Sequence, residues 1–218
     1  SWFWMYPSEN LDTEDYYDQE CSWWHTDERG EVYRNRIRKI NGRSYAFDGI
    51  GRMQTGFVLF DGKSEFVARY EVDDWSSEDF IEGTIYGIEK SDLYLFSPDE
   101  LNDGSMQIGK DIAVELEDGV FHFGFASNGK AFGNRNRLQK KEGMYYINGL
   151  RLEADEEYGY GVVKVEDGAD TYYQVVDTRG KVIEGKKKIV KDKEGGYLLI
   201  IQNRLVAWCG DEDKPRWR

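Results

Sequence analysis

The chain has 218 residues, of which 15% are aromatic; it contains 24 glycines and only 3 prolines. Aromatic side chains favour strands and glycine marks turns, so this composition predicts an all-β protein of many short strands. The formal net charge of −13 repels phosphate backbones and anionic surfaces, and no segment is long enough for a transmembrane helix. We therefore expect no nucleic acid partner and no membrane insertion, whereas a cation or a neutral sugar is compatible with the charge.

The first predicted elements are rich in tryptophan. Residues 2–7 form an aromatic strand, residues 9–20 an acidic connector, and residues 21–38 a hairpin that carries Trp23 and Trp24 on its first strand. Adjacent residues of a strand point to opposite faces, so only one of these two tryptophans can be a core residue.

The stretch at residues 39–57 is the clearest predicted hairpin. Asn41-Gly42 between strand-like residues is a strong hairpin signal. Tyr45 and Phe47 lie two residues apart and share one face, with Ala46 on the other. A hairpin of roughly twenty residues is not stable alone, so it must pack against neighbours.

Residues 58–90 depart from this pattern. They contain a predicted turn at Asp61-Gly62, a strand over residues 66–70 and a segment, residues 74–81, that allows one or two helical turns capped by Ser76 or Ser77. We interpret them as an insertion that expands one unit, with a short helix allowed near residues 75–82.

Further strands and turns follow to the end of the chain. A basic cluster at residues 186–193 is typical of a strand edge that lysines protect from pairing. The later units are predicted at residues 93–110, 111–133, 137–152, 172–185 and 188–208.

A short tail repeats along the chain. The pattern Gly-x-(Met/Val)-x-x-Gly occurs at residues 51–56, 104–109 and 180–185, with looser versions after Gly30 and Gly129. The five turn glycines are separated by 21, 53, 25 and 51 residues, which are one or two units of about 25 residues. This spacing predicts a solenoid of stacked β-hairpin repeats, about seven or eight units, in one elongated domain over residues 1–218 with the insertion at about 58–90.

At residues 39–57 the sequence resembles the cell-wall-binding (choline-binding) repeats of Gram-positive surface proteins and the related glucan-binding repeats. Their pattern is roughly Asn-Gly-Lys-Trp-Tyr-Tyr-Phe-Asp-x-x-Gly-x-Met-x-Thr-Gly-Trp. The matching residues are Asn41, Gly42, Arg43, Tyr45, Phe47, Asp48, Gly51, Met53, Thr55, Gly56 and Phe57. The resemblance implies stacked β-hairpins with aromatic cages for choline between consecutive hairpins, where rings attract the quaternary ammonium group by cation–π interaction.

The sequence departs from the family at cage positions. Ser44 and Phe57 replace tryptophans, and Lys110 and Lys186 put a positive charge where a cage wall is expected. The resemblance leaves one candidate aromatic groove for a ligand. Its residues are Trp23, Trp24, Tyr45, Met53 and Phe57. The alternative interpretation is that these rings are core between hairpins.

Signals for catalysis are weak. Residues 104–110 satisfy the start of a phosphate-binding loop, but Asp111 replaces the required Ser or Thr. His25 and His122 lie in aromatic strands and are interpreted as structural, and no Cys/His spacing suggests zinc. We expect no enzyme, no cofactor and no metal.

The function that these features indicate is a non-catalytic module for cell-wall or surface glycan or choline binding. It would attach a secreted or cell-surface protein, although no signal peptide begins the sequence. The expected partners are cell-wall polysaccharide, choline-bearing teichoic acid or glucan. In the alternative, the repeats are only a scaffold and the insertion binds another surface protein; a glycan-processing enzyme is a third and weaker hypothesis.

Overall fold

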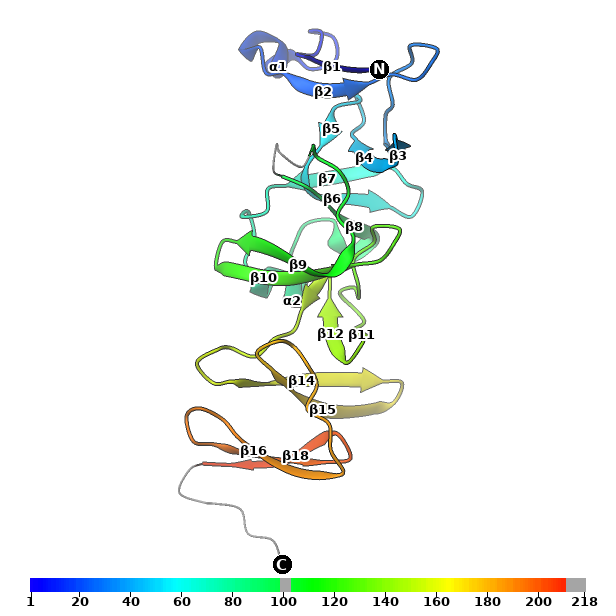
Figure 1. The fold of residues 1–218 in the computed structure, drawn as a ribbon. Coiled ribbons are helices and arrows are strands. Elements are labelled where there is room, and N and C mark those ends of the chain that lie inside the picture. The colour runs from blue at the N-terminus through cyan, green and yellow to red at the C-terminus, as the bar shows by residue number, and fades with distance from the viewer. Residues whose placement is uncertain (99–102, 211–218) are drawn as a thin grey trace, which may run out of the picture. The chain divides into compact units, whose positions relative to one another are not determined.

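The computed structural model describes residues 1–98 and 103–210 (Figure 1). The chain divides into two compact units, residues 1–131 and residues from 132 onward. Within the described residues, both are built from short antiparallel strands, with two short helices and one 3-10 turn in the first unit. The all-β prediction is confirmed.

The first unit consists of hairpins and three-stranded sheets. Strand β1 pairs with β2, β3 with β4 and β4 with β5, β6 lies between β7 and β8, and β9 pairs with β10. The bounds are β1 (Trp2–Met5), α1 (Thr13–Asp18), β2 (Ser22–His25), β3 (Arg36–Ile40), β4 (Arg43–Phe47), β5 (Met53–Gln54), β6 (Gly56–Asp61), β7 (Phe66–Tyr70), α2 (Ser77–Glu82), η1 (Ile88–Lys90), β8 (Ser91–Phe96), β9 (Gly109–Leu116) and β10 (Gly119–Phe125).

The second unit repeats the same design. Strand β12 lies between β11 and β13, β14 pairs with β15, and β17 lies between β16 and β18. The bounds are β11 (Gln139–Lys141), β12 (Met144–Ile147), β13 (Leu150–Arg151), β14 (Tyr160–Asp167), β15 (Asp170–Asp177), β16 (Lys187–Lys191), β17 (Tyr197–Ile201) and β18 (Arg204–Cys209).

One turn geometry recurs along the chain. An aspartate carboxylate accepts hydrogen bonds of 2.8–3.0 Å from the backbone N–H groups two and four residues further on. This closes the turn because it satisfies amides that the strands leave unpaired. The aspartates are Asp27, Asp48, Asp61 and Asp177.

The residue two positions after each turn glycine rejoins the preceding strand. Isolated bridges link Thr26 to Val32, Phe96 to Met106, Phe125 to Ala131 and Val176 to Val182, and Met53 pairs with Phe47 in the same way. The repeated tail found in the sequence is therefore the returning limb of these turns.

Successive turns of the first unit pack on one another. A Cβ atom added to Gly51 would clash with Val32, one added to Gly104 would lie 2.6 Å from the Cε atom of Met53, and one added to Gly129 would clash with Met106. In each case the side chain that follows one turn glycine covers the next turn glycine. Packing thus explains the repeat of about 25 residues: each turn needs a glycine, which has no side chain, where a side chain of the preceding repeat lies.

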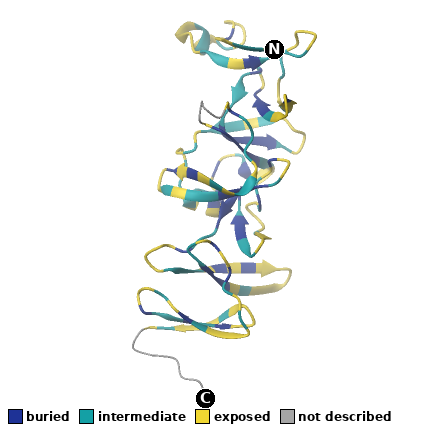
Figure 2. Ribbon diagram, in the orientation of Figure 1, coloured by how far each residue is buried: buried dark blue, intermediate teal, exposed yellow. Residues whose placement is uncertain are grey.

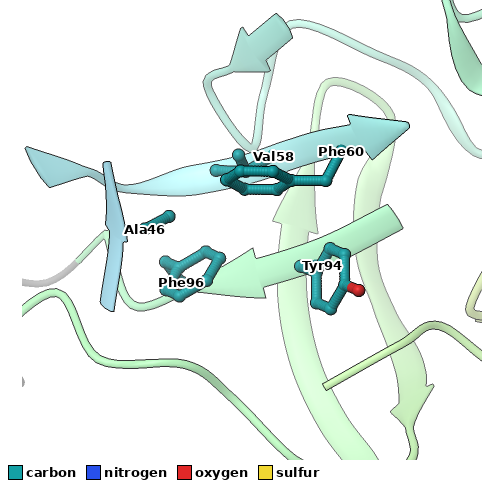
Figure 3. Close-up of a cluster of buried hydrophobic side chains, with 5 residues drawn as sticks. All are labelled: Ala46, Val58, Phe60, Tyr94 and Phe96. Atoms are coloured by element: carbon teal, nitrogen blue, oxygen red, sulfur yellow. The ribbon is translucent and has the colours of Figure 1, made fainter. Parts of the chain in front are cut away.

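Strands in the middle of the first unit bury different residues on their two faces. On β4, Tyr45 and Phe47 pack with Ile40, whereas Ala46 packs with Val58, Phe60, Tyr94 and Phe96 (Figure 3). This is the alternation that the sequence predicted. Strand β6 is buried along all but its last residue (Figure 2).

Strand β15 has the same two-sided character in the second unit. Val176 packs with Tyr145, Val163 and Val165, whereas its neighbour Val175 packs with Val190, Leu198 and Ile200. Apolar groups on both faces are removed from water only if both faces are covered, so each such hairpin depends on two neighbours.

The insertion supplies a short helix where the sequence allowed one. Helix α2 begins after Ser76, whose backbone N–H and hydroxyl both donate to the Asp79 carboxylate, at 3.0 and 2.7 Å. Asp118, in the β9–β10 turn, accepts from the backbone N–H and the hydroxyl of Ser77. These bonds seat the helix so that Phe80 is buried.

Substituting two turn glycines by alanine separates the free-energy cost of backbone strain from that of overpacking. Gly30 and Gly51 both have a positive φ, of 81° and 110°, but only Gly51 is covered, by Val32 and the backbone oxygen of Tyr33. We expect Gly30→Ala to cost about 1 kcal/mol for the backbone alone. Gly51→Ala adds overpacking of about 1–3 kcal/mol. Chemical unfolding of both variants measures the difference, and equal losses would contradict the stacking of the turns.

Acid should destabilise the turn that the Asp61 carboxylate closes. The backbone N–H groups of Glu65 and Lys63 hold the pKa of Asp61 below its ordinary value of 3.8. The charged carboxylate therefore stabilises the fold above that value, and this contribution is lost as the pH falls through the lowered pKa. In Asp61→Asn the amide oxygen can still accept, so we expect a weaker dependence of unfolding on pH below about 4, with most stability retained at pH 7. An unchanged pH profile would contradict this assignment.

Candidate functional site

The first hairpin gathers three tryptophans on one face. The pairing of Trp2 with His25 and of Trp4 with Trp23 places these four side chains on the same side of the β1–β2 ribbon. The rings of Trp4 and Trp23 lie 5.3 Å apart and tilted, and those of Trp2 and Trp23 lie 6.4 Å apart at right angles. We call Trp2, Trp4 and Trp23 the aromatic surface.

The aromatic surface is open to water at one end and anchored at the other. Trp4 and Trp23 are 56% and 44% exposed, and Trp2 is half-buried. The Trp2 ring lies 4.9 Å from that of Tyr45 and 6.0 Å from that of Phe47, and Met53 packs against the same cluster. Strand β4 thus fixes Trp2, which contacts the ring of Trp23, and Trp23 in turn contacts the ring of Trp4.

Hydrogen bonds fix Tyr45 beneath the surface. Its hydroxyl donates to Asp103 at 2.9 Å, and Arg43 forms an ion pair with the same carboxylate. Burial, followed by this hydrogen bond, raises the pKa of Tyr45, so the phenol stays neutral and remains a donor at neutral pH.

His25 is the remaining side chain on this face. Its ring stacks on Tyr33 at 5.3 Å and meets Trp2 edge-on at 4.8 Å. Burial lowers the pKa of His25, because a charged imidazole is poorly solvated there. The imidazole is therefore neutral at pH 7 and does not supply a competing cation to the rings.

An ionic network holds helix α1 to the β4–β5 turn. Arg52 donates to Asp48 at 2.9 Å and to Asp12 at 3.2 Å, and also pairs with Asp15. Asp12 caps the helix by accepting from the Asp15 N–H. Asp12 and Asp15 of the acidic connector therefore have structural roles.

The five residues predicted for the groove have different positions. The rings of Trp23 and Tyr45 lie beside that of Trp2, and Met53 packs against the same cluster of Ile40, Tyr45 and Phe47 as Trp2 does. Trp24 points to the other face of the ribbon, where it is 4% exposed and its indole N–H donates to the Met5 oxygen at 2.8 Å. Phe57 is 1% exposed and packs with Phe80 and Phe123. The structure thus brings three of the five together, and of the two adjacent tryptophans only Trp24 is core.

Sequence reasoning did not single out Trp2 and Trp4. Their spacing of two residues in Trp2-Phe3-Trp4 places both on one face, and that alternation was the available signal. Their pairing with Trp23 and His25 could not be read from the sequence, because it depends on the register across the connector.

Residues 1–98 and 103–210 contain no cluster of three or more His, Cys, Asp or Glu side chains that could hold a metal ion. Over the same ranges no helix is long and apolar enough to cross a membrane.

Known proteins offer structural likeness only. No family model and no curated protein matches the sequence. The chain is similar to the solved structure of choline binding protein F from Streptococcus pneumoniae, with a TM-score of 0.48 and 14% identity over 94% of this chain and 47% of that one. It is also similar to CbpJ from Streptococcus pneumoniae TIGR4, with a TM-score of 0.47 and 12% identity over 96% of this chain and 70% of that one. A third is the pneumococcal cell wall endolysin from phage Cp-1 complexed with choline, with a TM-score of 0.34 and 16% identity over 84% of this chain and 37% of that one. The chain spans less than half the length of the first of these proteins.

The two adjacent tryptophans should respond differently to truncation. Trp24→Ala removes a buried ring and a hydrogen bond, so we expect a loss of about 3 kcal/mol in the first hairpin. Trp23→Ala removes an exposed ring and should cost at most about 1 kcal/mol. Hydrogen exchange of the β2 amides measures both. Faster exchange in Trp23→Ala than in Trp24→Ala would overturn the assignment of faces.

Proposed function

We propose that the chain is a non-catalytic binding module that attaches a secreted or cell-surface protein to a Gram-positive cell envelope through the aromatic surface. The observation that carries the proposal is the pair of exposed indoles, Trp4 and Trp23, which lie side by side, with Trp23 also in contact with Trp2. The match of residues 41–57 to the cell-wall-binding repeat pattern supports it.

The chemistry of this surface suits a choline group or the face of a sugar. Indole is the best ring for cation–π attraction, worth about 0.5–2 kcal/mol per ring, and its apolar face also stacks on the C–H groups of a sugar. The net charge of −13 raises the local concentration of a cationic ligand. The proposed partners are accordingly choline-bearing teichoic acid, wall polysaccharide or glucan.

We also propose that the hairpins of each unit are stacked repeats of a solenoid, with residues 58–90 as an inserted expansion. The separate clusters on the two faces of β4 and of β15 support this arrangement. That residues 1–218 form a single repeat domain stays a prediction.

A second candidate function uses the insertion as a contact for another surface protein. One observation favours it: Tyr86 is 78% exposed, and Ile81 and Val67 are also exposed. Exposed apolar side chains of this kind are common at interaction surfaces. The repeats would then be scaffold.

Ligand titration tests the first proposal. Choline at millimolar concentration, and a glucan and peptidoglycan array, are applied to the whole chain and to Trp4→Ala, Trp23→Ala and Trp208→Ala. Trp208, at 76% exposure in the second unit, is the matched control. We expect each of the first two substitutions to weaken binding about 2- to 30-fold, which corresponds to about 0.5–2 kcal/mol for one ring, and the control to have no effect.

The outcomes separate the candidates. A response to sugars but not to choline keeps wall binding and changes the ligand. Equal losses in all three variants would overturn the aromatic surface as the site. No response to either ligand would favour the protein partner.

A further inference from the structure

Three apolar side chains of the insertion are exposed to water. Tyr86 is 78% exposed, Ile81 46% and Val67 37%, and we call these three the insertion surface. Tyr86 is held beside strand β7, because its backbone oxygen accepts from the Tyr70 hydroxyl at 3.0 Å. A Cβ atom added to the next residue, Gly87, would lie 3.2 Å from the Cγ1 atom of Val67. The Tyr86 backbone is therefore fixed next to Val67.

The core of the insertion does not need these side chains. Phe80, Ile85 and Ile88 are each at most 3% exposed, and they alternate in sequence with Ile81 and Tyr86. The buried residues hold the segment in place, so the exposed ones are presented on a fixed support. An exposed ring of this size on a fixed support is typical of an interaction surface.

The insertion also holds more than half of the net negative charge of the chain. Residues 71–89 contain seven Asp or Glu and no Lys or Arg, a net charge of −7 in a chain of −13. Three of the seven serve the fold. Glu71 pairs with Arg69, Asp74 accepts from the Glu71 N–H at 2.8 Å, and Asp79 caps α2. The other four are exposed and have no polar partner among the described residues: Asp73, Glu78, Glu82 and Glu89.

These carboxylates lie among the apolar side chains. On helix α2, Glu78 and Glu82 share a face with Ile81, because the three are spaced as i, i+4 and i+3. Glu82 and Glu89 lie four residues before and three residues after Tyr86, so their Cα atoms are within about 14 Å of that of Tyr86. The insertion surface therefore has an acidic rim.

The rim decides what kind of partner fits. Solubility would explain the charge, but it requires no exposed ring among the carboxylates. A second copy seated by the same surface would bring −7 against −7, which is repulsive. Charge complementarity selects a cationic partner and disfavours others, and the apolar side chains favour one that also carries apolar groups.

We propose that the insertion surface binds an arginine-bearing segment of a partner protein. A guanidinium group would stack on the Tyr86 ring and pair with Glu82 or Glu89, and aliphatic side chains of the segment would lie on Val67 and Ile81. Arginine suits this arrangement better than lysine, because the planar guanidinium both stacks on rings and pairs with a carboxylate through two hydrogen bonds. The proposal rests on the second candidate function above, in which the insertion contacts another protein.

The test measures binding of labelled peptides to the whole chain by fluorescence anisotropy at several NaCl concentrations. The peptides are four repeats of Arg-Leu-Ser, Lys-Leu-Ser, Arg-Ser-Ser or Ser-Leu-Ser. The site variants are Tyr86→Ser, and Glu82→Gln with Glu89→Gln. The matched controls change exposed residues of the second unit: Tyr158→Ser, and Glu157→Gln with Glu184→Gln.

We expect the Arg-Leu-Ser peptide to bind most tightly, at least about twofold tighter than the Lys-Leu-Ser peptide. Each site variant should weaken its binding at least about threefold, because a ring contact or two ion pairs are lost. The paired glutamine substitutions should also reduce the salt dependence of binding. Each control should change binding less than about twofold, and thermal unfolding checks that all variants are folded.

Equal losses in site and control variants would overturn the proposal, since the attraction would then be to the acidic chain as a whole. So would equal binding of the Arg-Ser-Ser and Arg-Leu-Ser peptides, or self-association in sedimentation that Tyr86→Ser abolishes. If the Ser-Leu-Ser peptide bound as tightly and with the same loss in Tyr86→Ser, the second candidate function would stand and the arginine chemistry would fail. Trp4→Ala and Trp23→Ala should leave peptide binding unchanged, so failure of the aromatic surface gives a different result.

Discussion

The carboxylate that closes the hairpin turns is the interaction on which the rest of the structure depends. Asp48 accepts three backbone N–H bonds, from Ile50, Gly51 and Arg52, and is buried while doing so. With these amides satisfied, the turn can be covered without leaving a buried donor unpaired, which would cost about 1–3 kcal/mol. The Cα atom of Gly51, which carries no side chain, then lies against Val32 of the preceding repeat.

Packing on two faces is the consequence for the strands. A ribbon of two or three short strands has too little apolar area on one face to be stable alone. Strands β4 and β15 meet this limit by placing different residues in separate clusters on their two faces. A face that its neighbour covers only in part keeps some side chains in contact with water, and the indoles of Trp4 and Trp23 are of that kind. The proposed aromatic surface uses this uncovered part.

Charge suits the ligand proposed for the aromatic surface. The chain is strongly acidic, and the aromatic surface contains no basic side chain, which suits a cation or a neutral sugar.

The sequence by itself determined the all-β class, the hairpin at residues 39–57, the alternation of Tyr45, Ala46 and Phe47, and the repeated turns, because turn glycines and period-two patterns are local. It also indicated that only one of Trp23 and Trp24 could be core. It did not show that Trp24 is that residue, that Trp2 and Trp4 join Trp23, or that Phe57 packs with Phe80 of the insertion. Those facts depend on which face of each ribbon meets which neighbour. Only the tertiary structure decided them, because strand register and the packing partner of a face come from contacts between residues far apart in the chain.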